Sequence, residues 1–227
     1  MTSRISSSLA AIGMVAAPAV MKFAEHRSAD AVSERRHDAD RSDGDTETDP
    51  TSRHCGVERW SIKVGSDGDA RDVDLRHARE TTIDALRQLP EPDDVDPDVR
   101  MAPTEDTVFV LRNVKLTHYK READSDYHLV LEDGHGKTVI AEIPEPGCLS
   151  HRSPWRRQVR AVRDAFDAAY EVSGRMRSAS DTVSLVGVGF FDVIHGQSGV
   201  APNGIELHPV LEICFGDDCE LALAGPG

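Results

Sequence analysis

The sequence predicts a small, β-rich domain with five main strands and one long helix. Five runs are rich in β-branched residues and partly alternate apolar with polar side chains, which indicates strands at 107–117, 127–131, 137–143, 182–194 and 205–213. Between the third and fourth runs, Ser153-Pro154 and Gly174 mark the start and the end of a helix at 154–172. Its apolar residues recur at helical spacing and predict a buried stripe of Trp155, Val159, Val162, Phe166 and Ala169.

The expected order of elements, β-β-β-α-β-β, is that of the OB-fold, a five-stranded and partly open barrel. Gly187 and Gly189 lie inside the fourth expected strand, where a small barrel needs its strands to bend. We therefore expect one β-rich, OB-like domain of the all-β or α+β class over residues 55–213. A short extension precedes the barrel, with a strand at 57–64 and a Thr-capped helix at 81–89. Another small β-barrel or a β-sandwich is the alternative.

The N-terminal region has the features of an export signal followed by a linker. Residues 1–24 contain Arg4, an apolar stretch at 5–15 and small residues at a cleavage-type site, 17–19. Residues 25–54 are highly charged and lack aromatic side chains, which predicts a disordered linker. The apolar stretch is shorter than the ~20 residues that span a bilayer, so we expect no integral membrane association. The expected location is extracellular or periplasmic, and a disordered cytosolic leader is the alternative.

Four cysteines form an even set that suits an oxidising compartment and permits three pairings. Cys214 and Cys219 flank a tight turn in the tail, 214–227, and could close a small disulfide loop, which leaves Cys55 to pair with Cys148. The spacing does not match a zinc motif. Structural disulfides are therefore expected, and reduced buried thiols are the alternative.

The charge balance bears on the class of partner. The chain has 26 Lys and Arg against 40 Asp and Glu, a formal net charge of −14. A field of this sign repels phosphates and anionic lipids, so non-specific nucleic-acid binding is disfavoured. Residues 90–106 are rich in proline and acids, and we expect a solvated loop there.

Two polar segments, 118–126 and 195–204, are expected at the same end of the barrel. They join the first two and the last two barrel strands, and OB-folds hold oligonucleotides and oligosaccharides with these loops. Glycines and an Asn-Gly turn in the second segment allow a ligand to approach the backbone. The expected ligand-binding residues are Tyr119, Asp126, Tyr127, Gln197 and Asn203.

The second segment and the strand after it contain a dense set of titratable side chains. Asp192, His195 and Glu206 are candidate catalytic residues, because carboxylates and imidazoles transfer protons near neutral pH. Glu206 and His208 lie two residues apart on a strand, so they project to one face and are candidate metal ligands. The alternative is that these polar groups satisfy the backbone of their own hairpin. His128, in an apolar strand, is expected to be a half-buried, hydrogen-bonded residue rather than a ligand.

Four strings in the chain resemble a family of uncharacterised, mostly exported bacterial proteins, which carry closely similar strings in the same order. They are ERWSIKVGSD (58–67), TTIDALRQLP (81–90), SDYHLVLEDGHGKTVIAEIPEPGC (125–148) and GFFDVIHGQSGVAPNGIELHPVLEI (189–213). The resemblance implies export and a single shared domain. It implies no activity, and the two cysteines of the tail lie outside it.

These observations favour an exported binding domain whose ligand, an oligosaccharide or a nucleic-acid end, lies between the two loops. One alternative is a metal-assisted hydrolase, such as a phosphodiesterase or nuclease, that uses the cluster from Asp192 to His208. No H-E-x-x-H, G-x-S-x-G or Walker motif supports the hydrolase. A structural or interaction protein without a small ligand is the second alternative. The sequence assigns no cofactor and does not decide whether the protein is an enzyme.

Overall fold

The computed structural model describes residues 55–56, 58–217 and 219–223, so the expected signal segment and the whole expected linker, 25–54, lie outside it. The longer elements are the helix α3 (Arg156–Ala169) and five strands, β2 (Val108–Arg121), β3 (Tyr127–Glu132), β4 (Thr138–Ile143), β6 (Thr182–Phe191) and β7 (Ile205–Phe215). Short helical and strand segments complete the described chain: α1 (Trp60–Lys63), η1 (Asp69–Arg71), β1 (Arg79–Thr81), α2 (Ile83–Arg87), η2 (Thr104–Asp106), η3 (Pro146–Cys148) and β5 (Arg177–Ser178).

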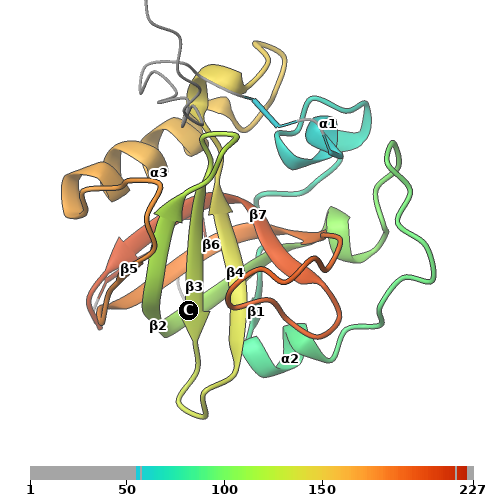
Figure 1. The fold of residues 1–227 in the computed structure, drawn as a ribbon. Coiled ribbons are helices and arrows are strands. Elements are labelled where there is room, and N and C mark those ends of the chain that lie inside the picture. The colour runs from blue at the N-terminus through green and yellow to red at the C-terminus, as the bar shows by residue number, and fades with distance from the viewer. Residues whose placement is uncertain (1–54, 57, 218, 224–227) are drawn as a thin grey trace, which may run out of the picture. The chain divides into compact units, whose positions relative to one another are not determined.

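The five longer strands close into a barrel (Figure 1). Neighbours follow the order β2-β3-β4-β7-β6, and pairing of β6 with β2 closes the ring. The β4–β7 pair is parallel, and the other four pairs of the ring are antiparallel. With α3 between β4 and β6, this is the arrangement of an OB-like barrel, which confirms the predicted fold class. Two short strands, β1 and β5, pair with β2 and were not predicted.

The glycines of β6 let neighbouring chain segments approach closely. A Cβ atom on Gly189 would lie 2.6 Å from the carbonyl oxygen of Thr104, and one on Gly187 would lie 2.9 Å from Cβ of Leu207. The register between β6 and β7 shifts at these two glycines. The strand therefore bends where the sequence predicts it, because a larger residue would collide with the neighbouring backbone or side chain.

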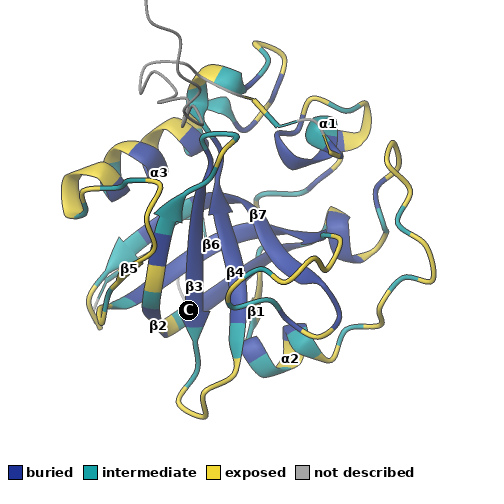
Figure 2. Cartoon of the chain, viewed as in Figure 1, coloured by how far each residue is buried: buried dark blue, intermediate teal, exposed yellow. Residues whose placement is uncertain are grey.

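Two apolar clusters lie on opposite faces of the strands. The larger contains alternate residues of all five barrel strands together with Val162 and Phe166 of α3, and it fills the barrel. The smaller surrounds Trp155 and Val159 and packs on the other face of β2 and β6. The predicted stripe of α3 is thus buried as far as Phe166, while Ala169 is exposed. Figure 2 shows the barrel strands as largely buried, and the outer side of α3 as exposed.

The expected strand at 57–64 is wrong, because Trp60–Lys63 forms a single helical turn, α1. The side chain of Arg59 fixes this segment through hydrogen bonds to the carbonyl oxygens of Asp96, Val99 and Phe191, at 2.9 Å each. A strand here would need a sheet edge to pair with, whereas the turn is held by a side chain. The helix expected at 81–89 is confirmed over the shorter range of α2, and Oγ1 of its cap, Thr82, accepts a hydrogen bond from the backbone N–H of Ala85.

Both expected disulfides are present, with S–S distances of 2.01 Å for Cys55–Cys148 and 2.09 Å for Cys214–Cys219. Strand β7 continues through Cys214, and Leu221 of the tail is buried in the smaller apolar cluster. The first residues of the tail therefore pack on the domain. Among the described residues, no helix has the length and apolar character needed to cross a bilayer.

Candidate functional site

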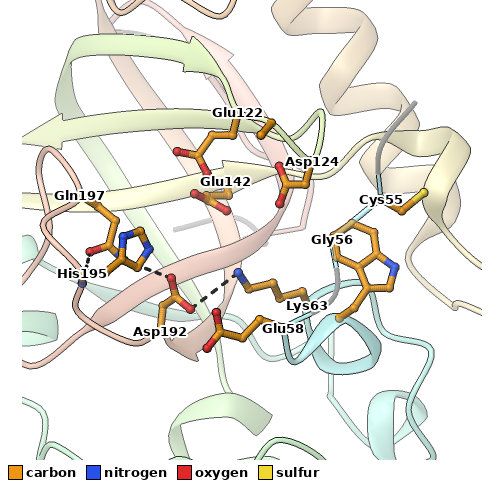
Figure 3. Close-up of a pocket in the computed structure, with 12 residues that line it drawn as sticks. Cys55, Gly56, Glu58, Lys63, Glu122, Asp124, Glu142, Asp192, His195 and Gln197 are labelled. Carbon is orange, nitrogen blue, oxygen red and sulfur yellow. Dashed lines mark hydrogen bonds and ion pairs between the residues drawn. The ribbon is translucent and has the colours of Figure 1, made fainter. Parts of the chain in front are cut away.

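A pocket of about 450 Å³ opens where three parts of the chain meet: the segment around α1, the loop after β2 and the loop after β6 (Figure 3). The two loops are those that the sequence predicts as ligand-binding. The lining is rich in acidic side chains, Glu58, Glu122, Asp124, Glu142 and Asp192. Figure 3 shows Glu122, Asp124 and Glu142 gathered on one side of the pocket, with Asp192 and His195 on another and Lys63 extending toward Asp192.

Glu142 of β4 links the pocket lining to one face of β3, β4 and β7. Leu129, Ala141 and Leu207 belong to the core inside the barrel, so the residues that alternate with them point to the opposite face. On that face His128 pairs across the strands with Glu142, and Glu206 pairs with Ile140 on the parallel neighbour. In OB-folds, the second and third barrel strands and the two adjacent loops form the binding face. Here those strands are β3 and β4.

A run of imidazoles and carboxylates lies on this face, and all of its members are buried. Glu142 joins two histidines: its Oε1 lies 3.1 Å from Nδ1 of His128, and its Oε2 lies 3.1 Å from Nδ1 of His208. The same Nδ1 of His208 is 3.3 Å from Oε1 of Glu206. On the far side of the ring, Nε2 of His208 is 3.6 Å from Oδ2 of Asp126, too far for a hydrogen bond. The described residues offer neither of these two atoms a hydrogen-bond partner.

The protonation of this cluster differs from that of the same groups in water. Burial raises the pKa of Asp126 to about 8. Burial and the charge of Glu142 raise the pKa of Glu206 to about 7. Burial opposes the charged form of His208, but hydrogen bonds to Glu142 and Glu206 outweigh it and raise its pKa to about 10. Two carboxyl groups that exchange protons near neutral pH therefore lie beside a charged imidazole, a combination more frequent at functional sites than elsewhere.

Two groups at the pocket wall, Glu142 and Lys63, are stabilised in their charged forms. Burial would raise the pKa of Glu142, but hydrogen bonds from His128 and His208 hold it below the usual range. Burial would lower the pKa of Lys63, but the surrounding carboxylates, Glu206 first among them, raise it above its ordinary value. Its Nζ lies 3.7 Å from Oδ1 of Asp192. The pocket thus presents fixed negative charge with one ammonium group.

The structure brings three of the residues predicted for the site to the pocket: Asp192, His195 and Gln197. They also bond to one another within their loop. Nε2 of Gln197 donates to Asp192 at 3.2 Å, and Oε1 of Gln197 accepts from the backbone N–H of His195 at 2.9 Å. The imidazole of His195 stays exposed at the rim.

The other predicted ligand-binding residues lie in different surroundings. Residues 118–121 belong to β2 rather than to a loop, and Tyr119 is buried against Phe166 with ring centroids 5.7 Å apart. Tyr127 also packs on Phe166, at the same separation, and its hydroxyl donates to Asp167 at 2.7 Å. Both tyrosines alternate into the barrel core, which places them away from the pocket.

Asn203 and Asp126 hold backbone in place. Nδ2 of Asn203 donates to the carbonyl oxygens of Leu86 and Leu89, at 3.0 Å each, and so fixes the end of α2. Oδ1 of Asp126 accepts from the backbone N–H of Glu145 at 2.8 Å, and the residue is 0% exposed. Asn203 therefore serves its own hairpin and its neighbour, as the alternative interpretation of this segment expects.

Ligand atoms of metal-binding type converge in two groups among the described residues, Glu122–His128–Glu142 and Asp126–Glu142–His208, each within 4.8 Å. The predicted ligand His208 belongs to one of them, whereas Glu206 belongs to neither. The sequence did not predict Lys63, Glu122 or Glu142 as site residues. It predicted His128 to be a half-buried residue rather than a ligand, whereas His128 is fully buried beside Glu142. The available signal was the placement of His128 and Glu142 at alternate positions of otherwise apolar strands, where a charged side chain must either face solvent or find a partner.

Comparison with known proteins adds little to this picture. No family model matches the chain, and no curated protein matches it. A solved structure assigned as an aspartyl-tRNA synthetase from Leishmania major Friedlin aligns with 61% of this chain at 13% sequence identity and a TM-score of 0.34. The aligned part spans 20% of that protein, and a likeness of this size shows neither fold nor function.

Proposed function

We propose that this chain is an exported binding domain that holds a neutral, hydroxyl-rich ligand, such as the end of an oligosaccharide, in the pocket between loops 122–126 and 192–204. The observation that carries the proposal is the convergence of five carboxylates from separate segments on one pocket of about 450 Å³. Carboxylates accept hydrogen bonds from sugar hydroxyls, and Trp60, which also lines the pocket, offers an apolar ring face. The two disulfides support export.

The charge of the pocket favours a sugar over a nucleic-acid end. Among the described residues that line it, Lys63 and His195 are the basic ones, and Lys63 is already engaged with Asp192. A phosphate would face five carboxylates at close range, in addition to a net charge of −14 over the chain. Hydroxyl groups avoid this repulsion.

Calorimetric titration with a panel of neutral oligosaccharides, and with oligonucleotides of matched length, tests the proposal. Glu58→Gln and Asp124→Asn change pocket carboxylates with little change in shape. We expect each to weaken sugar binding at least tenfold, because a hydrogen bond to a charged group contributes ~1.5–3 kcal/mol and 1.4 kcal/mol corresponds to about tenfold in affinity. Glu132→Gln, at the end of β3 and outside the pocket lining, is the matched control. Binding of oligonucleotides alone, or sugar binding unchanged in both pocket variants, would contradict the proposal.

A metal-assisted hydrolase is the second candidate, favoured by one specific observation. Glu122, His128 and Glu142 bring ligand atoms within 4.8 Å beside a pocket that His195 also lines. A metal at this point would activate water, and His195 would serve as the general base. Metal-dependent cleavage of a phosphodiester by the wild-type chain, lost in His195→Ala, would select this candidate. Absence of cleavage with Zn²⁺, Mn²⁺ and Mg²⁺ would remove it.

A further inference from the structure

We propose that Glu122, His128 and Glu142 form a binding site for a first-row divalent cation, such as Zn²⁺, in the wall of the pocket. The inference goes beyond the proposed ligand-binding function and does not depend on the identity of the ligand. It also differs from the sequence-based expectation, which took Glu206 and His208 as the metal ligands. The site combines two carboxylates with one imidazole, a donor set that zinc and manganese accept.

The distances between the three donor atoms suit a common metal ion. Nδ1 of His128 lies 3.1 Å from Oε1 of Glu142 and 3.5 Å from Oε1 of Glu122. Two ligands that each sit ~2.1 Å from a tetrahedral ion are roughly 3.4 Å apart, as simple geometry gives from zinc bond lengths. The side chains therefore need only small adjustments to share one cation.

The tautomer of His128 favours this use. Its Nε2 lies 2.9 Å from the backbone carbonyl oxygen of Ser198, which can only accept a hydrogen bond, so Nε2 carries the proton. Nδ1 faces the two carboxylates, and in the metal-free chain it also carries a proton that it donates to Glu142; a divalent cation would displace this proton and bind the lone pair. Histidines that bind metals commonly donate their other N–H to a backbone carbonyl, which fixes the orientation of the ring. Ser198 supplies this support from the loop after β6.

In the metal-free chain, the proton on Nδ1 of His128 satisfies only one of the two carboxylates. A single N–H directed at Glu142 leaves Glu122 at 3.5 Å without a hydrogen bond from the ring. Nζ of Lys120 lies 2.9 Å from the same oxygen of Glu122 and compensates that charge in part. The side chain of Lys120 is 32% exposed, so it can turn to solvent when a divalent ion takes its place.

The residues behind the site fix the orientation of Glu142. Oε2 of Glu142 is held by His208, which leaves Oε1 directed at His128. Further back, Oδ2 of Asp126 and Nε2 of His208 are buried without a hydrogen-bond partner among the described residues, and their side chains belong to a second ligand group that shares Glu142. Unpartnered buried polar atoms are uncommon in folded proteins and call for a partner such as an ion or water. Because Nδ1 of His208 faces Glu142, its Nε2 and the facing Oδ2 of Asp126 lie on the other side of the ring and belong to that second group.

Access and electrostatics are also suitable. Glu122 and Glu142 both line the pocket, and the side chain of Glu122 is 27% exposed, so an ion can enter from solvent. Because His128 is 1% exposed, the ion would be held at the pocket wall with its remaining coordination positions toward the cavity. An open coordination position distinguishes catalytic or substrate-binding metal sites from closed structural ones.

Calorimetric titration of the metal-free full chain with ZnCl₂ alone tests the inference. We expect one site of wild-type affinity that Glu122→Gln weakens at least tenfold, because one charged ligand is replaced by a weaker neutral donor. Glu132→Gln removes a carboxylate from the same strand as His128 and should retain wild-type affinity. Since both positions are partly exposed, both variants should fold, which unchanged circular dichroism would verify. Equal affinities in the two variants, or no binding by the wild type, would overturn the proposal.

A second measurement separates the metal from a proton. In ¹⁵N-detected spectra of the histidine side chains, Zn²⁺ should move the Nδ1 resonance of His128 while Nε2 keeps its proton. Binding of zinc with that resonance unchanged would place the ion on other side chains and refute the assignment. Because no sugar is present, these results stand apart from the oligosaccharide titration. Zinc binding without sugar binding would reject only the proposed function, and the reverse would reject only the metal site.

Discussion

The buried ion pair between Arg59 and Glu105 fixes the N-terminal segment to the barrel, and its removal should be costly. The two side chains are 2% and 0% exposed, and they form two hydrogen bonds, at 2.7 and 2.8 Å. Glu105 also accepts from the backbone N–H groups of Met101 and Phe191, at 2.7 and 2.9 Å. Its carboxylate thus receives four charged or backbone donors. We predict that Glu105→Gln strongly destabilises the fold.

The size of the effect follows from these contacts. A glutamine has one acceptor oxygen in place of two, so two of the four donors lose their acceptor, and the guanidinium of Arg59 keeps its charge without a counter-ion. Removing one partner of a buried ion pair typically costs ~3–5 kcal/mol. For a chain of this size, 1 kcal/mol corresponds to about 2–4 °C in melting temperature, so Tm should fall by about 6–20 °C.

Urea unfolding followed by circular dichroism provides the free energy of unfolding for each variant. Glu80→Gln is the matched control, because Glu80 pairs with Arg112 at the surface and is 66% exposed, and such pairs contribute ~0–1 kcal/mol. A double-mutant cycle with Arg59→Met should give a coupling energy of ~1–3 kcal/mol. A loss below about 1 kcal/mol for Glu105→Gln, similar to that of the control, would refute the argument that this pair holds the segment.

Three further predictions follow from the same structure. Replacing Cys55 and Cys148 by serine removes a disulfide that spans a sequence separation of 93, which should lower the free energy of unfolding by up to about 4–5 kcal/mol. Chemical denaturation would measure this loss, and an unchanged midpoint would contradict the prediction. His195→Ala, at the exposed rim, should change the free energy of unfolding by less than about 0.5 kcal/mol. Glu206→Ala, at a buried position, should lower it by ~1–3 kcal/mol, and equal melting temperatures of the two variants would contradict this difference. Thr82→Ala removes the cap of α2 and should cost ~1 kcal/mol, measured in the same way, and no loss would mean that α2 does not depend on its cap.

The barrel could be predicted because its determinants are local. Alternation of apolar residues sets each strand, a helical stripe sets α3, and glycines mark the bends, so the order of elements follows from patterns within ten to twenty residues. The segment at 57–64 shows the limit of this reasoning. Its alternation is typical of a strand, yet the bonds of Arg59 to a carboxylate and to carbonyl oxygens 37 to 132 residues away decide its conformation. The solvated loop expected at 90–106 likewise contains the buried Glu105.

The predicted topology indicates where the candidate site lies, but the sequence alone does not identify the residues that form it. The order of strands placed the loops 118–126 and 195–204 at one end of the barrel, and Glu122 and His195 from these loops line one pocket. Alternation also showed that Glu206 and His208 share a face. It could not show that this face is covered, because the cover comes from distant segments: Ser198 bonds to His128 across 70 residues, and Lys63 approaches from the N-terminal side.

Burial of that face changes what its polar residues imply. A solvated glutamate or histidine on a strand costs little and needs no explanation, but His128, Glu142, Glu206 and His208 are all buried between apolar neighbours. Replacing a buried charged cluster with well-packed apolar residues is often neutral or stabilising, so stability alone gives weak reason to retain one. The cluster also lies where OB-folds bind their ligands, and it reaches solvent through Glu122 and Glu142 at the pocket wall. The function of this chain is therefore better sought in these strand residues than in the exposed hairpin, and the response of the His128 Nδ1 resonance to Zn²⁺ tests that choice.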